Sequence, residues 1–163
     1  MPAFTVRAAR QSDGAFLADM VVEAANWRPE AERRRHEVLA GADYQRYLTG
    51  WMRPGDAGVV ALSPGAEPVG AAWYRMFPRT EPGFAYIGTG VPELIIGVRP
   101  IWRSHGVGRL LVQRLCEHAR EEGFGRISLS VERGNFAATL YRSEGFAVTS
   151  AGIGRDAMVK RLR

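Results

Sequence analysis

The residues best suited to bind a reactive ligand lie between Glu93 and Gly123, where an apolar run leads into a short basic turn and then an amphipathic stretch. Gly106 and Gly108 have no Cβ, so the backbone of this turn can approach a ligand closely. The first turn of a helix behind them would offer unpaired N–H groups and the positive end of the helix dipole. The pattern is typical of a phosphate-binding loop and predicts an anionic ligand.

The segments around this loop alternate between strand-like and helix-like patterns, which predicts an α/β fold with helices on both sides of a mixed sheet. We expect strands at residues 4–8, 59–62, 69–77, 94–98, 126–131, 146–148 and 157–162, and helices at about 13–25, 29–47, 106–122 and 135–142. Ser12 or Asp13 is the expected cap of the first helix, and Gly41 should interrupt the second. The nearly all-apolar run at 94–98 predicts a central strand, joined to the strand at 126–131 by a helical crossover.

Length and composition predict one domain spanning residues 1–163, because 46% apolar residues suffice to bury a core. Cys116 is the single cysteine, which excludes an internal disulfide and leaves no cysteine cluster for zinc; on the apolar side of its helix, it is expected in the core. No histidine has a paired metal-ligand spacing, so we expect no metal. The sequence shows no signal-like or membrane-spanning apolar run, which predicts no membrane association and a cytoplasmic location.

The net charge of +5 favours an anionic partner. Two basic groups, 33–35 and 160–163, fit solvated faces, whereas Arg99, Arg103 and Arg109 bracket the glycine loop. The chain has no recognised DNA-reading motif and no aromatic residues interleaved with the run at 33–35, so we expect no nucleic acid partner.

Two motifs together resemble the GNAT superfamily of acyl-CoA-dependent N-acetyltransferases. The loop Arg103-Ser104-His105-Gly106-Val107-Gly108 is similar to the family's Q/R-x-x-G-x-G/A pattern, and the segment 135–146, NFAATLYRSEGF, is similar to its N-x-x-A-x-x-x-Y-x-x-x-G-F pattern. The resemblance implies a mixed, mostly antiparallel twisted sheet of about seven strands. Between the two central parallel strands it implies a V-shaped splay that receives the cofactor.

The resemblance also implies a function, namely transfer of an acetyl group from acetyl-CoA to a primary amine by direct attack in a ternary complex. A catalytically silent acyl-CoA-binding module is the alternative, because such a module would keep the loop without the catalytic groups. The acceptor is left open by the sequence, and a homodimer is one option for the oligomeric state.

The cofactor-binding residues implied by the resemblance fall into three groups. A backbone amide of Ile96, Gly97 or Val98 would bind the pantetheine arm and polarise the thioester carbonyl. Asn135 would reach the pantetheine, or would serve as a helix cap alone. The pyrophosphate would be bound by the loop and first helical turn, Arg103, Ser104, His105, Gly106, Val107, Gly108, Arg109 and Leu110.

Two residues carry the catalytic roles in this interpretation. Tyr141 would donate a proton to the departing thiolate, to which a phenol of pKa near 10 is suited, unless it is a core tyrosine. Glu93 would be the general base, with a surface ion pair or an anchor for a cationic substrate as alternatives. Trp27 and Tyr86 are the expected acceptor-side residues, although aromatic residues are more often core.

Overall fold

The strand-forming runs of the sequence assemble into one mixed sheet in a computed structural model that describes residues 3–163, without the side chain of Ala31. The strands are β1 Thr5–Ala8, β2 Ala57–Leu62, β3 Pro68–Arg75, β4 Glu93–Val98, β5 Arg126–Glu132, β6 Ala147–Ala151 and β7 Arg155–Arg161. Their order in the sheet is β1-β2-β3-β4-β5-β7-β6. The predicted fold class, with about seven strands, is therefore confirmed.

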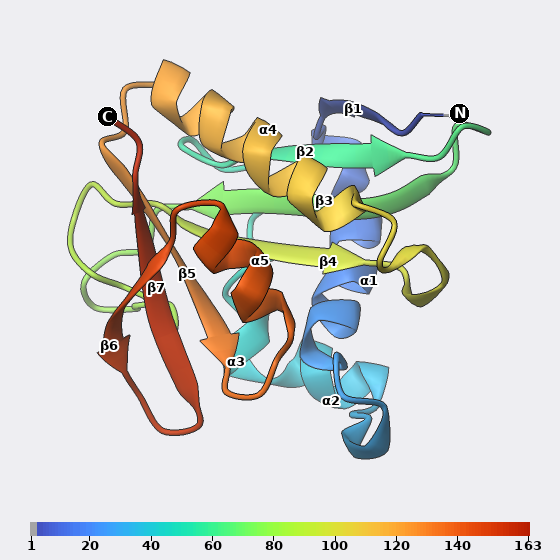
Figure 1. Ribbon diagram of the computed structural model, residues 1–163. Coiled ribbons are helices and arrows are strands. Elements are labelled where there is room, and N and C mark those ends of the chain that lie inside the picture. Colours follow the sequence, from blue (N-terminus) through green and yellow to red (C-terminus); the bar gives the residue numbers. More distant parts are fainter. Residues whose placement is uncertain (1–2) are drawn as a thin grey trace.

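The parallel pair β4 and β5 is central, and every other neighbouring pair is antiparallel. The β4–β5 ladder joins Glu93 to Ser128 and Leu94 to Leu129 and then stops, although β4 continues to Val98. The two strands diverge beyond this point, as Figure 1 shows. This divergence is the predicted splay.

The helices cover both faces of the sheet, with α4 on one face and α1 on the other (Figure 1). They are α1 Gly14–Ala25, α2 Arg35–Ala40, α3 Ala42–Gln45, α4 Val107–Glu121 and α5 Ala137–Ser143, with short 3-10 turns at Gln11–Asp13, Pro29–Ala31 and Pro100–Trp102. The α4 helix connects β4 to β5, as the crossover prediction requires.

Alternation along the strands divides the core in two, because successive side chains point to opposite faces. On β3, Trp73 packs with Leu17 and Met20 of α1, whereas Ala72 and Tyr74 belong to the core under α4. Gly97 on β4 allows the close approach of α1, since a Cβ there would overlap the backbone of Met20. The sequence of β4 therefore fixes how near α1 lies to the splay.

Three local predictions need correction. Asp13 occupies the N-cap position of α1, as one of the two predicted caps, but its carboxylate accepts hydrogen bonds from Arg7 and from the Arg10 N–H and makes no cap hydrogen bond to α1. The helix expected at 29–47 is broken before Arg35 as well as at Gly41. The closing strands extend to Ala151 and begin at Arg155, which leaves a tight connection at 152–154.

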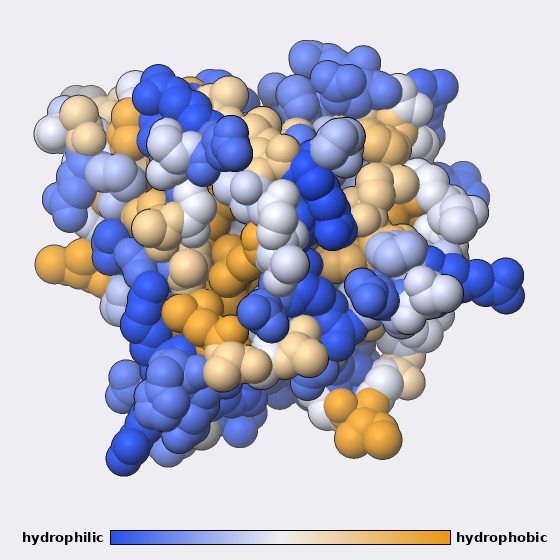
Figure 2. Space-filling model, turned by 180° about the vertical axis from the view of Figure 1, so that it is seen from behind, coloured by the Kyte–Doolittle hydropathy of each residue, from blue (hydrophilic) through white to orange (hydrophobic). Residues whose placement is uncertain are grey.

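The face that carries α1 is a mosaic of hydrophilic and apolar side chains (Figure 2). Large exposed apolar residues are scattered over separate segments, among them Ile101 in the 3-10 turn before α4 and Ile153 between β6 and β7. Within residues 3–163, no helix combines the length and the apolar character needed to cross a membrane.

Candidate active site

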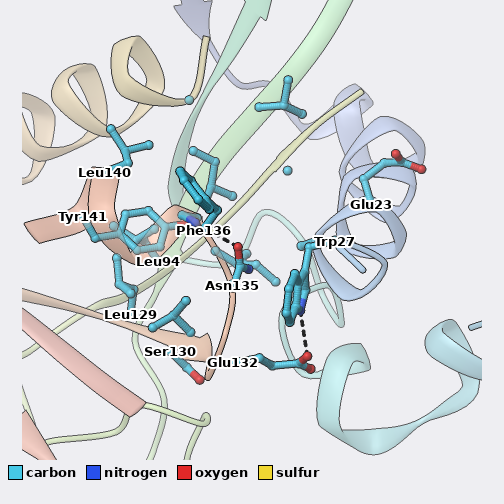
Figure 3. A pocket seen from close by; sticks show the side chains of 18 of the residues that line it. Glu23, Trp27, Leu94, Leu129, Ser130, Glu132, Asn135, Phe136, Leu140 and Tyr141 are labelled. Carbon is cyan, nitrogen blue, oxygen red and sulfur yellow. Dashed lines mark hydrogen bonds between the residues drawn. The ribbon is translucent and has the colours of Figure 1, made fainter. Parts of the chain in front are cut away.

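A cleft of about 700 Å³ opens where β4 and β5 diverge. Figure 3 shows Glu23 and Trp27 on the α1 side of this cleft and Leu140 and Tyr141 on the opposite side. Its walls include β4 from Leu94 to Val98, β5 from Leu129 to Glu132, the glycine loop and the start of α5. The cleft therefore joins the two motifs that the sequence places about 30 residues apart.

The edge of β4 offers backbone hydrogen-bonding groups to the cleft. Alternate residues of a strand direct their peptide groups to opposite sides. Since the Arg99 N–H donates to Val69 on β3 and the Pro92 carbonyl accepts from Ser128 on β5, Ile96 and Val98 face the cleft. Gly97 lines the cleft but directs its peptide groups to β3, so the geometry favours Ile96 and Val98 as ligand-binding amides.

The glycine loop turns through left-handed backbone conformations at Ser104, with φ of 63°, and at Gly106, with φ of 83°. Gly106 is the N-terminal cap of α4, and no side chain caps this helix end. The first-turn amides from Val107 to Arg109 are therefore available to an anion. Leu110 does not fit its predicted role, because its N–H already donates to the Gly106 carbonyl at 3.1 Å.

The charged side chains of the loop are paired with other parts of the chain. Arg103 lines the cleft, but its guanidinium donates to the Val98 carbonyl and to Glu23 of α1. Arg109 also lines the cleft and binds Glu144 and Ser143 at the end of α5. Arg103 and Arg109 therefore connect the loop to α1 and α5, and the amides of the first turn of α4 are the groups of this loop that have no partner within the helix.

His105 and Val107 lie outside the cleft lining. The exposed His105 ring contacts the Arg103 carbonyl at 2.8 Å, and the Val107 side chain is buried in the core under α4. For Val107, the backbone amide is the group that can serve the predicted site.

Asn135 lines the cleft at the start of α5 (Figure 3). Its Oδ1 accepts the N–H of Ala137, the first residue of α5, at 2.9 Å, although Phe136 and not Asn135 occupies the N-cap position. The same side chain carries an NH₂ group, which can donate to a ligand amide. The two roles proposed for Asn135 are therefore compatible.

Tyr141 lies on α5, is 7% exposed and lines the cleft with its neighbours Leu140 and Leu94 (Figure 3). Its ring packs edge-to-face on Phe146. Burial raises the pKa of the Tyr141 phenol well above its ordinary value, so the group stays protonated at neutral pH. The core packing of Tyr141 is therefore compatible with the acid role expected from the sequence.

Glu93 begins β4 and is 2% exposed, so the surface ion pair considered from the sequence is absent. It is not among the residues that line the cleft. Tyr47, which does line the cleft, donates a hydrogen bond to Glu93 Oε2. Burial raises the pKa of Glu93 to about 7, although the hydrogen bond from Tyr47 opposes this shift.

Aromatic side chains line the part of the cleft nearest to Glu93. Trp27 lies there as predicted, together with Tyr44, Tyr47 and Phe84. Tyr86 does not line the cleft; Phe84, two residues earlier in the same loop, lines it instead. The irregular backbone of 78–90 gave no periodicity from which to choose between these two aromatic residues.

A polar network at this end was not predicted. Glu132, the last residue of β5, accepts hydrogen bonds from Trp27 at 2.7 Å, Arg33 at 3.1 Å and Arg155 at 3.0 Å. Burial acts to raise the pKa of Glu132, but the hydrogen bonds from Trp27 and Arg33 outweigh it and hold the pKa below its ordinary value. The carboxylate thus stays ionised and ties four segments of the chain together, since Tyr44 also lies within reach.

These features define a class of protein: a splayed parallel pair with an open β4 edge, an amide-rich helix start and a buried phenol belong to an acyl-CoA-dependent acetyltransferase fold. The sequence model of the acetyltransferase (GNAT) family matches residues 19–146. The chain belongs to this family, and the resemblance inferred from the two motifs is confirmed.

Individual relatives agree with this assignment. The mycothiol acetyltransferase of Jonesia denitrificans is 30% identical over 138 residues, which cover 83% of this chain and 40% of that protein. The mycothiol acetyltransferase of Nocardia farcinica is 28% identical over 140 residues, covering 83% of this chain and 42% of that protein. The chain thus spans about two fifths of the length of these curated relatives.

Solved structures match over nearly the whole chain. The PaiA N-acetyltransferase of Thermoplasma acidophilum, in complex with coenzyme A, has a TM-score of 0.73 at 15% identity and covers 98% of this chain and 99% of its own. The ribosomal-protein-alanine N-acetyltransferase of Brucella melitensis has a TM-score of 0.66 at 26% identity, covering 96% of this chain and 99% of its own.

Proposed function

We propose that this chain transfers an acetyl group from acetyl-CoA to a primary amine by direct attack within a ternary complex. The observation that carries the proposal is the edge of β4 that β5 leaves unpaired. This edge lines the same cleft as the start of α4 and Tyr141. Membership of the acetyltransferase family supports it.

The cleft fits the cofactor that the family implies. The free amides of the first turn of α4 would hold the pyrophosphate, and the peptide groups of Ile96 and Val98 would pair with the amides of the pantetheine arm. The cofactor supplies the acetyl group as an activated thioester. Ile96 is the first residue after the β4–β5 ladder whose N–H faces the cleft, so it would polarise the carbonyl at the apex.

Tyr141 is the proposed acid. A phenol held protonated by burial can donate its proton to a departing thiolate, and Tyr141 lies on the cleft wall from which that thiolate can be reached. The silent acyl-CoA-binding module does not need this group, so Tyr141 supports the enzyme over the alternative.

Glu93 is the proposed proton acceptor for the amine. A carboxylate with a pKa of about 7 is half-ionised near neutral pH and matched to general-base work. The required help depends on the amine, since neutralising a lysine-like amine at pH 7 costs about 4.6 kcal/mol whereas an α-amine of pKa near 8 costs about 1.4 kcal/mol.

The proposed function is tested by thiol release from acetyl-CoA in the presence of spermidine, kanamycin, L-lysine and a peptide with an N-terminal alanine. We expect amine-dependent release of the thiol with at least one acceptor. A Gly108→Trp variant should lose this release, because its side chain would meet Leu140 and fill the cleft proposed for the cofactor. Stabilisation of the chain by coenzyme A without release for any amine would instead identify a silent binding module.

Three broader expectations stay predictions. We propose residues 1–163 as one domain, supported by the single sheet that runs from β1 to β7. We propose the cytoplasm as the compartment, supported by the unpaired and buried thiol of Cys116, whose pKa burial raises to about 11. A homodimer is tested by light scattering of the chain at several concentrations.

A further inference from the structure

The proposed proton acceptor is separated from the cleft by a tyrosine. Glu93 and Tyr47 are each 2% exposed, but Tyr47 is among the residues that line the cleft and Glu93 is not. Tyr47 donates its hydroxyl hydrogen to Glu93 Oε2. The ring of Tyr47 is fixed on both sides, by edge-to-face contact with Phe77 and by stacking with Phe84. An amine in the cleft would therefore meet the Tyr47 side of this pair first.

The Tyr47 hydroxyl has bonding capacity left. It donates once, to Glu93, and accepts once, from the Phe84 N–H at 3.2 Å. A phenolic oxygen has two acceptor lone pairs, so one lone pair remains for a proton arriving from the cleft. The hydrogen bond from Phe84 fixes the orientation of this lone pair.

Glu93 has an oxygen that the fold leaves without a partner. Within residues 3–163, Glu93 Oε1 is the buried side-chain polar atom that makes no hydrogen bond. A Cβ on Gly83 would overlap this oxygen, so the backbone of the 78–90 loop lies directly against it. A buried carboxylate with one unsatisfied oxygen is costly, which favours uptake of a proton.

We propose that Tyr47 is a catalytic residue that accepts the proton of the attacking amine and passes its own hydroxyl proton to Glu93 in the same step. The step balances: an N–H bond of the amine breaks, an O–H bond forms on Tyr47, and the original Tyr47 proton bonds to Glu93 Oε2. Tyr47 remains a neutral phenol throughout and Glu93 becomes a neutral acid. The proposal rests on the acetyltransferase function above.

The surroundings of the pair suit such a transfer. Burial raises the pKa of Glu93 and prevails over the groups that act to lower it, which besides Tyr47 are the backbone of Ala85 and the charges of Arg46 and Arg155. Arg75 lies opposite Glu93 on β3, but its guanidinium is committed to the buried carboxylate of Asp56. Ser128 lies opposite Glu93 on β5, but its hydroxyl donates to the Ala85 carbonyl and not to Glu93. No other described side chain competes with Tyr47 for Glu93.

The pair could instead be a structural contact of the core, and kinetics separate the two roles. We compare the chain with Tyr47→Phe and Glu93→Gln, using the amine of the panel that gives the fastest thiol release. Tyr74→Phe is the matched control, because Tyr74 is 1% exposed in the opposite core and does not line the cleft. The rise in Tm on addition of coenzyme A measures cofactor binding and shows that each variant is folded.

The expected result is a fall in kcat/KM of about 10²–10⁴-fold for Tyr47→Phe and for Glu93→Gln. Each variant should lose the rise in kcat/KM through pH about 7 that the parent chain shows, and the double variant should be no slower than either single one. Tyr74→Phe should keep the parental rate and pH profile. Retention of the parental rate and pH limb by Tyr47→Phe would overturn the relay while leaving acetyl transfer established.

A measurement that needs no acceptor tests the same contact. The Glu93 carboxyl carbon can be titrated by NMR in the chain labelled at glutamate side chains, with Glu93→Gln identifying the signal. Tyr47→Phe should raise the pKa of Glu93, because the hydrogen bond that favours the ionised form is removed. An unchanged titration midpoint would overturn the relay even where every amine of the panel is inactive.

Discussion

Gly97 on β4 controls the distance between α1 and the cleft, and Gly97→Ala should disturb both stability and acceptor binding. A Cβ at this position would lie 2.9 Å from the carbonyl carbon and 3.0 Å from the Cα of Met20, and nearer still to the Met20 carbonyl oxygen. The Met20 carbonyl oxygen is the nearest obstacle, and because carbon and oxygen atoms pack at about 3.3 Å or more, α1 must move away from β4 by about 1 Å.

The obstacle is backbone, so rotation of a side chain does not relieve it. Overpacking of this kind costs about 1–3 kcal/mol, and we expect the free energy of unfolding to fall by that amount. The shift would also carry Glu23 and Trp27, which line the cleft from α1 and its C-terminal end. The KM for the amine should therefore rise more than the KM for acetyl-CoA.

Urea unfolding and the two KM values check this prediction. Gly125→Ala is the matched control, because a Cβ at Gly125 meets no atom within 4 Å and the residue lies outside the cleft. If Gly97→Ala unfolded at the same urea concentration as Gly125→Ala, the argument that Gly97 sets the α1–β4 distance would be wrong.

The remaining predictions concern the ionisable groups of the cleft. Tyr141→Phe should lower kcat by about 10²-fold at every pH while the Tm shift on binding coenzyme A is kept, because the phenol acts on the leaving group; an unchanged kcat would remove Tyr141 from the mechanism. Glu93 should make the fold less stable at higher pH, since its pKa is raised from 4.5 to about 7 in the folded chain and the folded state holds the proton more tightly. The free energy of unfolding that protonated Glu93 contributes is fully present below pH about 4.5 and is lost as the pH rises through about 7. The total loss should be about 3 kcal/mol. Urea unfolding at pH 5 and pH 8 checks this, and Glu93→Gln should remove most of the difference.

The cofactor half of the site was predictable because glycines and helix starts have local signatures. Gly106 and Gly108 mark the turn, and the roles expected of Asn135 and Tyr141 came from the resemblance of one short motif to the family pattern. The structure places all four residues along one cleft. The pairing of Arg103 with Glu23 was not predictable, because these residues lie 80 positions apart.

The acceptor half was less predictable because long-range contacts create it. Tyr47 meets Glu93 across 46 positions, and Trp27 meets Glu132 across 105. Neither pair has a periodic or local signal in the sequence. The register of β4 predicted that Glu93 shares a face with Ile95 and Gly97, but the burial of its carboxylate behind Tyr47 depends on how the 78–90 loop folds over it.

The short β4–β5 ladder has a consequence for cooperativity. Two residue pairs are all the strand pairing that joins the half-sheet β1–β4 to the half-sheet β5–β7, so backbone hydrogen bonding couples the two halves weakly at this seam. A cofactor that pairs with Ile96 and Val98 takes the place of the missing strand contacts. Binding would then link the two half-sheets into one unit that opens less often, and slower amide hydrogen exchange in β5 and β7 would report it.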